Sequence, residues 1–225
     1  MVNRLIQYIS VFLALLLVLP IHEFAHAFVA VKSGDNTPKI YGRYTLNPMA
    51  HFDVLGLVCL LFVHFGWAKP VPVNPNNFKH PKLDSFLVAI AGVTANYLLA
   101  FIVYPILVID VLYVPEFYYF TEVLYYSLYY AFFISLALAV FNFLPIYPLD
   151  GFRVVDVFVR RRGKVYYIYK KYGYFVLLAF ILLGIIADYA NLPEIDLLGR
   201  AITYLVNKIS IPITSFWGLI FNGRV

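Results

Sequence analysis

An apolar stretch near the N-terminus, VFLALLLVLPIHEFAHAFVAV at residues 11–31, contains three ionisable side chains within five positions. They are His22, Glu23 and His26. A helix that crosses a bilayer core of about 30 Å takes roughly 20 apolar residues, and this stretch is long enough. Each ionisable side chain at such a depth costs about 2.5–3.5 kcal/mol to insert, so these residues usually face a functional cavity. The stretch therefore predicts a membrane-spanning helix that carries a polar site.

The composition of the whole chain is that of an integral membrane protein. Of its 225 residues, 63% are hydrophobic and 13% are charged, with a mean hydropathy of +0.81. These values exclude an ordinary soluble domain. The net charge of +5 does not predict a nucleic-acid partner, because the basic residues concentrate in one loop beside apolar segments. The single Cys59 excludes an intramolecular disulfide and a thiolate metal site.

The lengths of the apolar segments predict which of them cross the bilayer. Those long enough are residues 5–31, 85–113, 121–147 and 172–190. A further candidate at 198–221 is interrupted by Arg200, Asn207 and Lys208. The run at 54–66 is too short, which favours a segment that enters the membrane and returns.

Charges between these segments predict the topology. The loop after residue 150 is rich in Lys and Arg, whereas the connections at 110–122 and 188–196 are acidic. Cytoplasmic loops are enriched in Lys and Arg, so we expect the loop after residue 150 to be cytoplasmic. Counting back along the spans puts residues 69–82 on the same side. We expect a multi-pass protein of the cell membrane.

The two histidines have the spacing of metal ligands. On a helix, His22 and His26 lie on one face a turn apart and can bind one ion. In the HExxH pattern the two His bind zinc and the Glu is the general base for the attacking water, which assigns that role to Glu23. A five-residue pattern with three fixed positions also occurs by coincidence, and that alternative stays open at this point.

A catalytic zinc usually has three protein ligands, so a third ligand is expected elsewhere in the chain. Asp150 is the best candidate, because it ends a stretch in which Pro145 and Pro148 break an apolar helix. The alternative is a helix-capping Asp at the end of a span. If Asp150 meets the histidines at one depth, residues 32–53 are cytoplasmic, residues 54–66 re-enter, and the active site lies nearer the cytoplasmic face.

These observations predict an all-α polytopic membrane protein. We expect about five to six transmembrane helices, with a re-entrant element between the first and second full spans. The membrane-embedded core is predicted at residues 1–155. It includes the re-entrant segment 54–66. Residues 156–225 are predicted to form accessory C-terminal transmembrane helices.

Four stretches together resemble the site-2 protease family of intramembrane metalloproteases, in particular small prokaryotic members without PDZ or CBS domains. They are HEFAH at 22–26, the LNP of 46–48 with residues 51–56, FGWAKPVPVN at 65–74, and NFLPIYPLDG at 142–151. The resemblance implies that His22, His26 and Asp150 bind one Zn²⁺ ion and that Glu23 activates water. It also implies that the enzyme cuts a transmembrane segment of another protein within the lipid bilayer, as in regulated intramembrane proteolysis.

The resemblance further implies substrate-binding residues. Asn142 is expected to hold the substrate or the transition state. Asn96 is a candidate for a polar contact in the site, although Val93 stands where the family commonly has Pro, and an interhelical hydrogen bond is the alternative. The resemblance also implies a β-like element between the first and second full spans, with a strand-like segment at 69–74, in which Val71 and Val73 are expected to present an edge to an extended substrate. A plain membrane-surface loop is the alternative for that segment.

Two other functions use the same features. A membrane transporter could bind its metal at the same His and Asp residues, and it would keep its metal flux without Glu23. A catalytically silent membrane scaffold would have no need of three ligands and a base. The identity of the substrate and the oligomeric state are not encoded in any motif of the chain.

Overall fold

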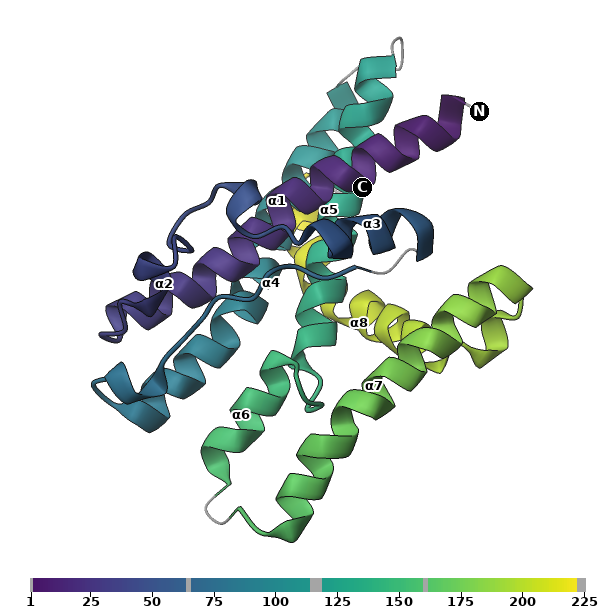
Figure 1. The fold of residues 1–225 in the computed structure, drawn as a ribbon. Helices are drawn as coiled ribbons and strands as arrows, with labels where there is room; N and C mark the ends of the chain where they lie inside the picture. The colour runs from purple at the N-terminus through teal and green to yellow at the C-terminus, as the bar shows by residue number, and fades with distance from the viewer. Residues whose placement is uncertain (1, 64–65, 114–118, 160–161, 222–225) are drawn as a thin grey trace.

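The structure, a computed structural model, describes residues 2–63, 66–113, 119–159 and 162–221. Five long helices dominate it (Figure 1): α1 (Val2–Lys32), α4 (Pro81–Tyr113), α5 (Tyr119–Phe143), α7 (Lys164–Ala190) and α8 (Leu197–Ile220). The shorter elements are α2 (Thr37–Ile40), η1 (Pro48–Ala50), α3 (Val54–Val63), η2 (Pro75–Asn77), α6 (Asp150–Phe158) and η3 (Pro193–Ile195). The expected all-α class is therefore confirmed.

Four helices are long and apolar enough to cross a membrane: Arg4–Lys32, Pro81–Leu112, Thr121–Phe143 and Lys164–Ala190. They correspond to the four uninterrupted segments of the sequence, and the chain is a membrane protein. The third of them ends at Phe143 rather than at residue 147 as predicted. Pro145 and Pro148 account for the difference, since neither can donate the backbone hydrogen bond that would continue α5. The predicted segment at 198–221 forms α8, which is not among these four helices.

The core of the molecule is the contact between α1, α4 and α5. Small side chains let the helix backbones approach closely, as is common between helices in membranes. Ala14 of α1, Ala100 of α4 and Ala131 of α5 are all buried there. Larger side chains fill the space between them, including Val18 and Leu136, which are fully buried. This three-helix contact holds α1 and α4 rigidly side by side.

Helix α8 crosses this bundle and makes a specific contact with α4. Within α4, Pro105 has no N–H to donate to the carbonyl of Phe101, one turn earlier. The indole Nε1–H of Trp217 donates to that carbonyl instead, at 3.0 Å. Val206 and Ile213 are buried against the same bundle. The sequence at 198–221 therefore forms a helix that is packed onto the core.

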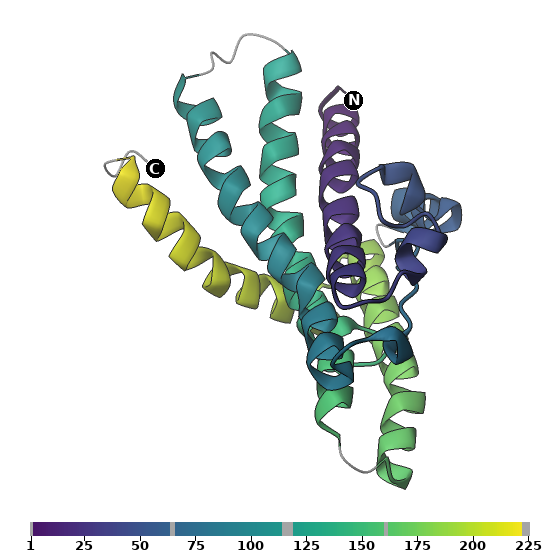
Figure 2. The same cartoon turned by 90° about the vertical axis from the view of Figure 1, so that its left-hand side faces the viewer.

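The first part of the connection between α1 and α4, with α2 and α3, lies on the side of α1 that faces away from α5 (Figure 2), whereas its last part, with η2, contacts α4. Helix α3 has ten residues and is about 15 Å long, which is too short to cross a bilayer. The segment predicted to be strand-like, 69–74, forms no strand within the described residues. An isolated antiparallel bridge joins Phe52 to Ala68 just before it. Residues 64 and 65, which belong to the predicted re-entrant segment and to one matching motif, lie outside the described residues.

Candidate metal centre

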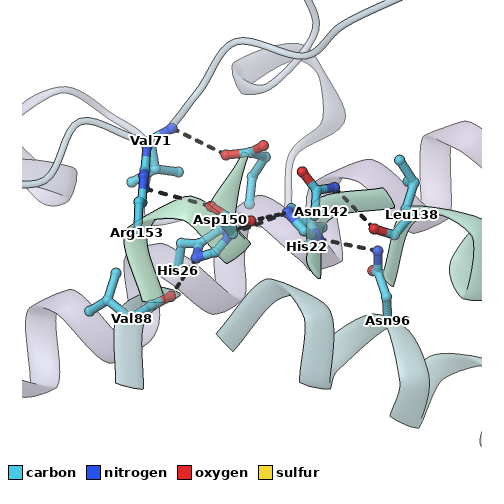
Figure 3. A network of polar contacts seen from close by, with 10 residues as sticks. His22, His26, Val71, Val88, Asn96, Leu138, Asn142, Asp150 and Arg153 are labelled. Carbon is cyan, nitrogen blue, oxygen red and sulfur yellow. Dashed lines mark hydrogen bonds and ion pairs between the residues drawn. The ribbon is translucent and has the colours of Figure 1, made fainter. Parts of the chain in front are cut away.

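The three predicted ligands come together in one buried cluster (Figure 3). Helix α1 supplies His22 and His26, whose Nε2 atoms are 3.1 Å apart. Asp150 is the first residue of α6, and its Oδ2 lies 3.0 Å from His26 Nε2 and 3.3 Å from His22 Nε2. All three side chains are buried. A single metal ion can therefore contact one atom from each of them.

The outer nitrogen of His26 fixes its tautomer. His26 Nδ1 lies 2.7 Å from the backbone carbonyl oxygen of Val88, which can only accept a hydrogen bond. Nδ1 therefore carries a proton, and in the neutral ring Nε2 has a free lone pair. That lone pair faces a carboxylate oxygen of Asp150 and the Nε2 of His22. A metal ion or a shared proton can bridge atoms gathered around one point in this way.

His22 is held on its outer side by Asn96 of α4. The amide Nδ2 of Asn96 lies 3.1 Å from His22 Nδ1. Asn96 is fully buried, and its Oδ1 has no hydrogen-bond partner among the residues that the structure describes. The side chain predicted to be either a substrate contact or an interhelical hydrogen bond therefore contacts a candidate ligand from behind.

A glycine of α4 makes room for both imidazoles. A Cβ atom added to Gly92 would overlap His26 Nε2 and, at 2.5–2.6 Å, His22 Cε1 and Nε2. Any side chain here would occupy the space that the two rings need. Val88, Gly92 and Asn96 are four residues apart in sequence, so they lie along one face of α4. Sequence reasoning missed the parts played by Val88 and Gly92.

Glu23 is half-buried beside the cluster and faces the connecting segment. Its Oε2 accepts a hydrogen bond from the backbone N–H of Val71 at 3.1 Å. Val71 is buried, and Val73 packs against the small apolar cluster of Ala30 and Val88. The segment predicted to present a substrate thus runs directly past the predicted general base.

Two further polar side chains border the cluster. Asn142 is half-buried in the last turn of α5, and its amide nitrogen donates to the carbonyl of Leu138 in its own helix at 3.1 Å. Arg153, one turn after Asp150 on α6, places its Nη1 3.8 Å from the second carboxylate oxygen, Oδ1. The guanidinium therefore lies near the ligand cluster without taking the oxygen that faces the histidines.

The chain is similar to a known protein family and to a curated protein. Residues 118–184 match the model of peptidase family M50, a region that contains Asp150 but neither histidine. A protein of Bacillus subtilis named "Putative zinc metalloprotease YwhC" is 45% identical over 138 residues. The match covers 60% of this chain, and the chain spans about three fifths of that relative's length, 62%. No solved structure matches the chain.

The family match and the curated relative agree with the resemblance carried by the four sequence motifs. They also agree with a fold of apolar helices around buried histidines and an aspartate. Residues 118–184 are thus similar to peptidase family M50, and the name of the relative indicates a zinc metalloprotease, in agreement with the resemblance to the site-2 proteases.

Proposed function

We propose that this protein is a zinc metalloendopeptidase that hydrolyses peptide bonds within or near the transmembrane segments of other membrane proteins. The observation that carries the proposal is the convergence of His22, His26 and Asp150, with the carboxylate of Glu23 next to them. The helix that carries three of these residues is apolar enough to cross a membrane. The name of the Bacillus subtilis relative points to the same metal and the same chemistry.

The ligand set suits zinc. Two imidazole nitrogens and one carboxylate oxygen are the donors of many catalytic zinc sites, which keep a fourth position open. With bonds of about 2.0–2.1 Å, neighbouring ligand atoms around a tetrahedral zinc lie about 3.3 Å apart. The three separations here are 3.0, 3.1 and 3.3 Å. The atoms already have nearly the spacing that the ion requires.

Zinc binding also sets the orientation that we expect of the Asn96 amide. Ligation through Nε2 of His22 requires the proton of the neutral ring to be on Nδ1. That N–H needs an acceptor, and the amide of Asn96 provides one when Oδ1 rather than Nδ2 faces the ring. Asn96 then accepts a hydrogen bond from Nδ1–H of His22, as the Val88 carbonyl does from Nδ1–H of His26. Each imidazole is thereby held in the tautomer that leaves Nε2 available for the metal.

The bound zinc supplies Lewis acidity for water and the peptide carbonyl. Glu23 accepts the proton of the attacking water and transfers it to the leaving amine nitrogen. A carboxylate has several acceptor positions, so Glu23 can hold the Val71 N–H and still take this proton. We propose that Asn142, at the end of α5, contacts the substrate. Burial of the cluster excludes bulk water, which strengthens these interactions.

Substrate presentation falls to the segment around Val71 and Val73. A transmembrane helix hides its peptide bonds, and its backbone groups need new partners in the membrane once it unwinds. An extended segment beside Glu23 offers such partners. Pro70 and Pro72 have no N–H, so at these positions the segment offers carbonyl oxygens alone. The substrate would then donate its own N–H groups to them.

We further propose that the site lies near the cytoplasmic face, with residues 32–53 in the cytoplasm. Helix α3 then enters the membrane and returns, and α8 is the fifth crossing helix. An accessibility tag at residue 45 should react from the cytoplasm only. Labelling from outside the cell would refute this topology.

The function is tested with purified, reconstituted protein and a model transmembrane substrate. Wild type should hold one zinc per chain and cleave the substrate, and a chelator should stop cleavage until zinc is restored. Glu23→Gln should keep its zinc and lose about 10²–10⁴-fold in kcat. Glu122→Gln, an exposed glutamate at the first turn of α5, is the control and should cleave normally. Undiminished cleavage by Glu23→Gln would refute the proposal, and metal flux into sealed vesicles that survives Glu23→Gln would favour a transporter.

A further inference from the structure

The segment at 70–74 reaches Glu23 without the support of a sheet. No strand within the described part of the chain pairs with it, and Pro70 and Pro72 cannot donate to one. The residues before a proline are confined to extended backbone, which accounts for its shape but not for its position. Before it, Lys69 N–H donates to the carbonyl of His51 at 2.7 Å. The other end of the segment, at Asn74, must be held by a separate contact.

That anchor is the carboxylate of Asp35. Its Oδ2 accepts a hydrogen bond from the backbone N–H of Asn74 at 2.7 Å. Its Oδ1 accepts from the side-chain amide of Asn77 at 2.8 Å and from the backbone N–H of Thr37 at 3.0 Å. The Thr37 hydroxyl donates to the same oxygen. Asp35 is fully buried, so these partners take the place of water.

The position of Asp35 is fixed by the end of α1. Gly34 has a φ of 107°, a backbone conformation that favours glycine, and it turns the chain out of the helix. The N–H of Asp35 then bonds to the carbonyl of Ala30 at 3.0 Å, as in a Schellman motif. The carboxylate is therefore held rigidly relative to the helix that carries His22, Glu23 and His26. Asn74, which is bonded to Asp35, lies only three residues after Val71, which is bonded to Glu23.

We propose that Asp35 is a positioning residue of this enzyme, one that fixes the extended segment 70–74 against Glu23 and so sets the register of the bound substrate. The proposal rests on the proposed function. Asp35 does not touch the reacting atoms, and it acts through the backbone of Asn74. The same helix thus carries the general base and, near its C-terminal end, the group that places the substrate-binding segment beside that base.

Asp35→Asn is the test, because it keeps the size of the side chain while replacing one acceptor oxygen by a donor. The matched control is Asp196→Asn. Asp196 also accepts a backbone hydrogen bond at one end of a helix, from Gly199 N–H at 2.9 Å, but it is the N-cap of α8 and has no hydrogen bond to residues 70–74 among the contacts of the described chain. The readouts are zinc content, kcat and KM, the distribution of cleavage sites in the substrate, and amide hydrogen exchange of residues 69–78.

Asp35→Asn should keep its zinc, raise KM by about tenfold or more, and spread cleavage over bonds next to the normal one. Exchange at residues 69–78 should become faster while residues 11–31 stay protected. Asp196→Asn should change neither KM nor the cleavage site. Wild-type KM and a single cleavage site in Asp35→Asn would overturn the proposal, as would unchanged exchange at 69–78, whether or not the wild type cleaves. Failure of the wild type to cleave would overturn the proposed function instead.

Discussion

Replacing Gly92 by Ala should weaken metal binding while the helix bundle stays folded. The added methyl would overlap atoms of both imidazoles, among them the Nε2 of each ring. Without a metal, the rings have only their outer hydrogen bonds with Val88 and Asn96 to hold them, so they can turn aside more easily than when a metal also binds both Nε2 atoms. With a metal bound they must return to the place that the methyl occupies, so the cost falls on binding.

Inserting a methyl group into a well-packed interior costs about 1–3 kcal/mol. Since 1.4 kcal/mol corresponds to a factor of ten, the dissociation constant for zinc should rise about 5- to 150-fold. The melting temperature of the metal-free protein should stay close to that of the wild type. Helix propensity works in the other direction, because Ala is favoured over Gly in a helix by about 1 kcal/mol.

Zinc titration against a competing chelator measures the affinity, and thermal unfolding of the metal-free protein measures the fold. The matched control is Gly218→Ala, because a Cβ at Gly218 of α8 meets nothing within 4 Å. Gly218→Ala should bind zinc as the wild type does. If Gly92→Ala also bound zinc with wild-type affinity, the two imidazoles would not need the space beside Gly92, and the arrangement of the site inferred here would be wrong.

Three further predictions concern other contacts. Asn96→Leu should weaken zinc binding about 10- to 100-fold, because it removes the acceptor for the Nδ1–H of His22, whereas Asn96→Asp should retain most of the affinity; chelator competition measures both. Burial alone would raise the pKa of Asp35, but its hydrogen bonds with Thr37, Asn74 and Asn77 lower it below the ordinary value. Its contribution to stability is therefore complete above a pH of about 4, the unfolded pKa, and is lost as the pH falls further, so the difference in melting temperature between wild type and Asp35→Asn should shrink there. Trp217→Phe should cost about 1 kcal/mol in the free energy of unfolding, since the Phe101 carbonyl loses its donor, and denaturant titration would show it.

The ligand cluster was predictable because its signals are side chains with few other uses in a bilayer. Two histidines a turn apart predict a shared ion, and Asp150 stands where two prolines stop a helix. The structure brings these residues together as expected, although α5 ends earlier than hydropathy alone suggested. The chain stays apolar beyond Phe143, so hydropathy alone extends the helix, whereas Pro145 and Pro148 end it.

The surroundings of the cluster were harder to predict, for physical reasons that differ from residue to residue. The partner of His26 at position 88 is a backbone carbonyl, which every residue has, so the side-chain sequence could not identify it. Gly92 precedes Asn96 by one helical turn, a signal that was present but has meaning only once α4 is known to face the histidines. Asp35 follows a glycine and precedes Asn36, a pattern that predicts a turn but not the distant Asn74. The strand-like segment 69–74 was implied by the family resemblance, but Pro70 and Pro72 cannot donate the hydrogen bonds of a strand ladder.

The register between α1 and α4 links the fold to the chemistry. On α1, Ala14 and Val18 lie in the core, and His22 and His26 follow at the same spacing of four residues. On α4 the stripe that begins at Val88 and continues through Gly92 and Asn96 reaches Ala100, which is buried against the same core. The metal site is therefore the polar continuation of one apolar helix contact. A shift of either helix by one residue would rotate its stripe by about 100°, so the packing that stabilises the bundle also keeps Asn96 and the Val88 carbonyl behind their histidines. The two functions of the contact are inseparable, because the same ridge of α4 meets the same face of α1 in both.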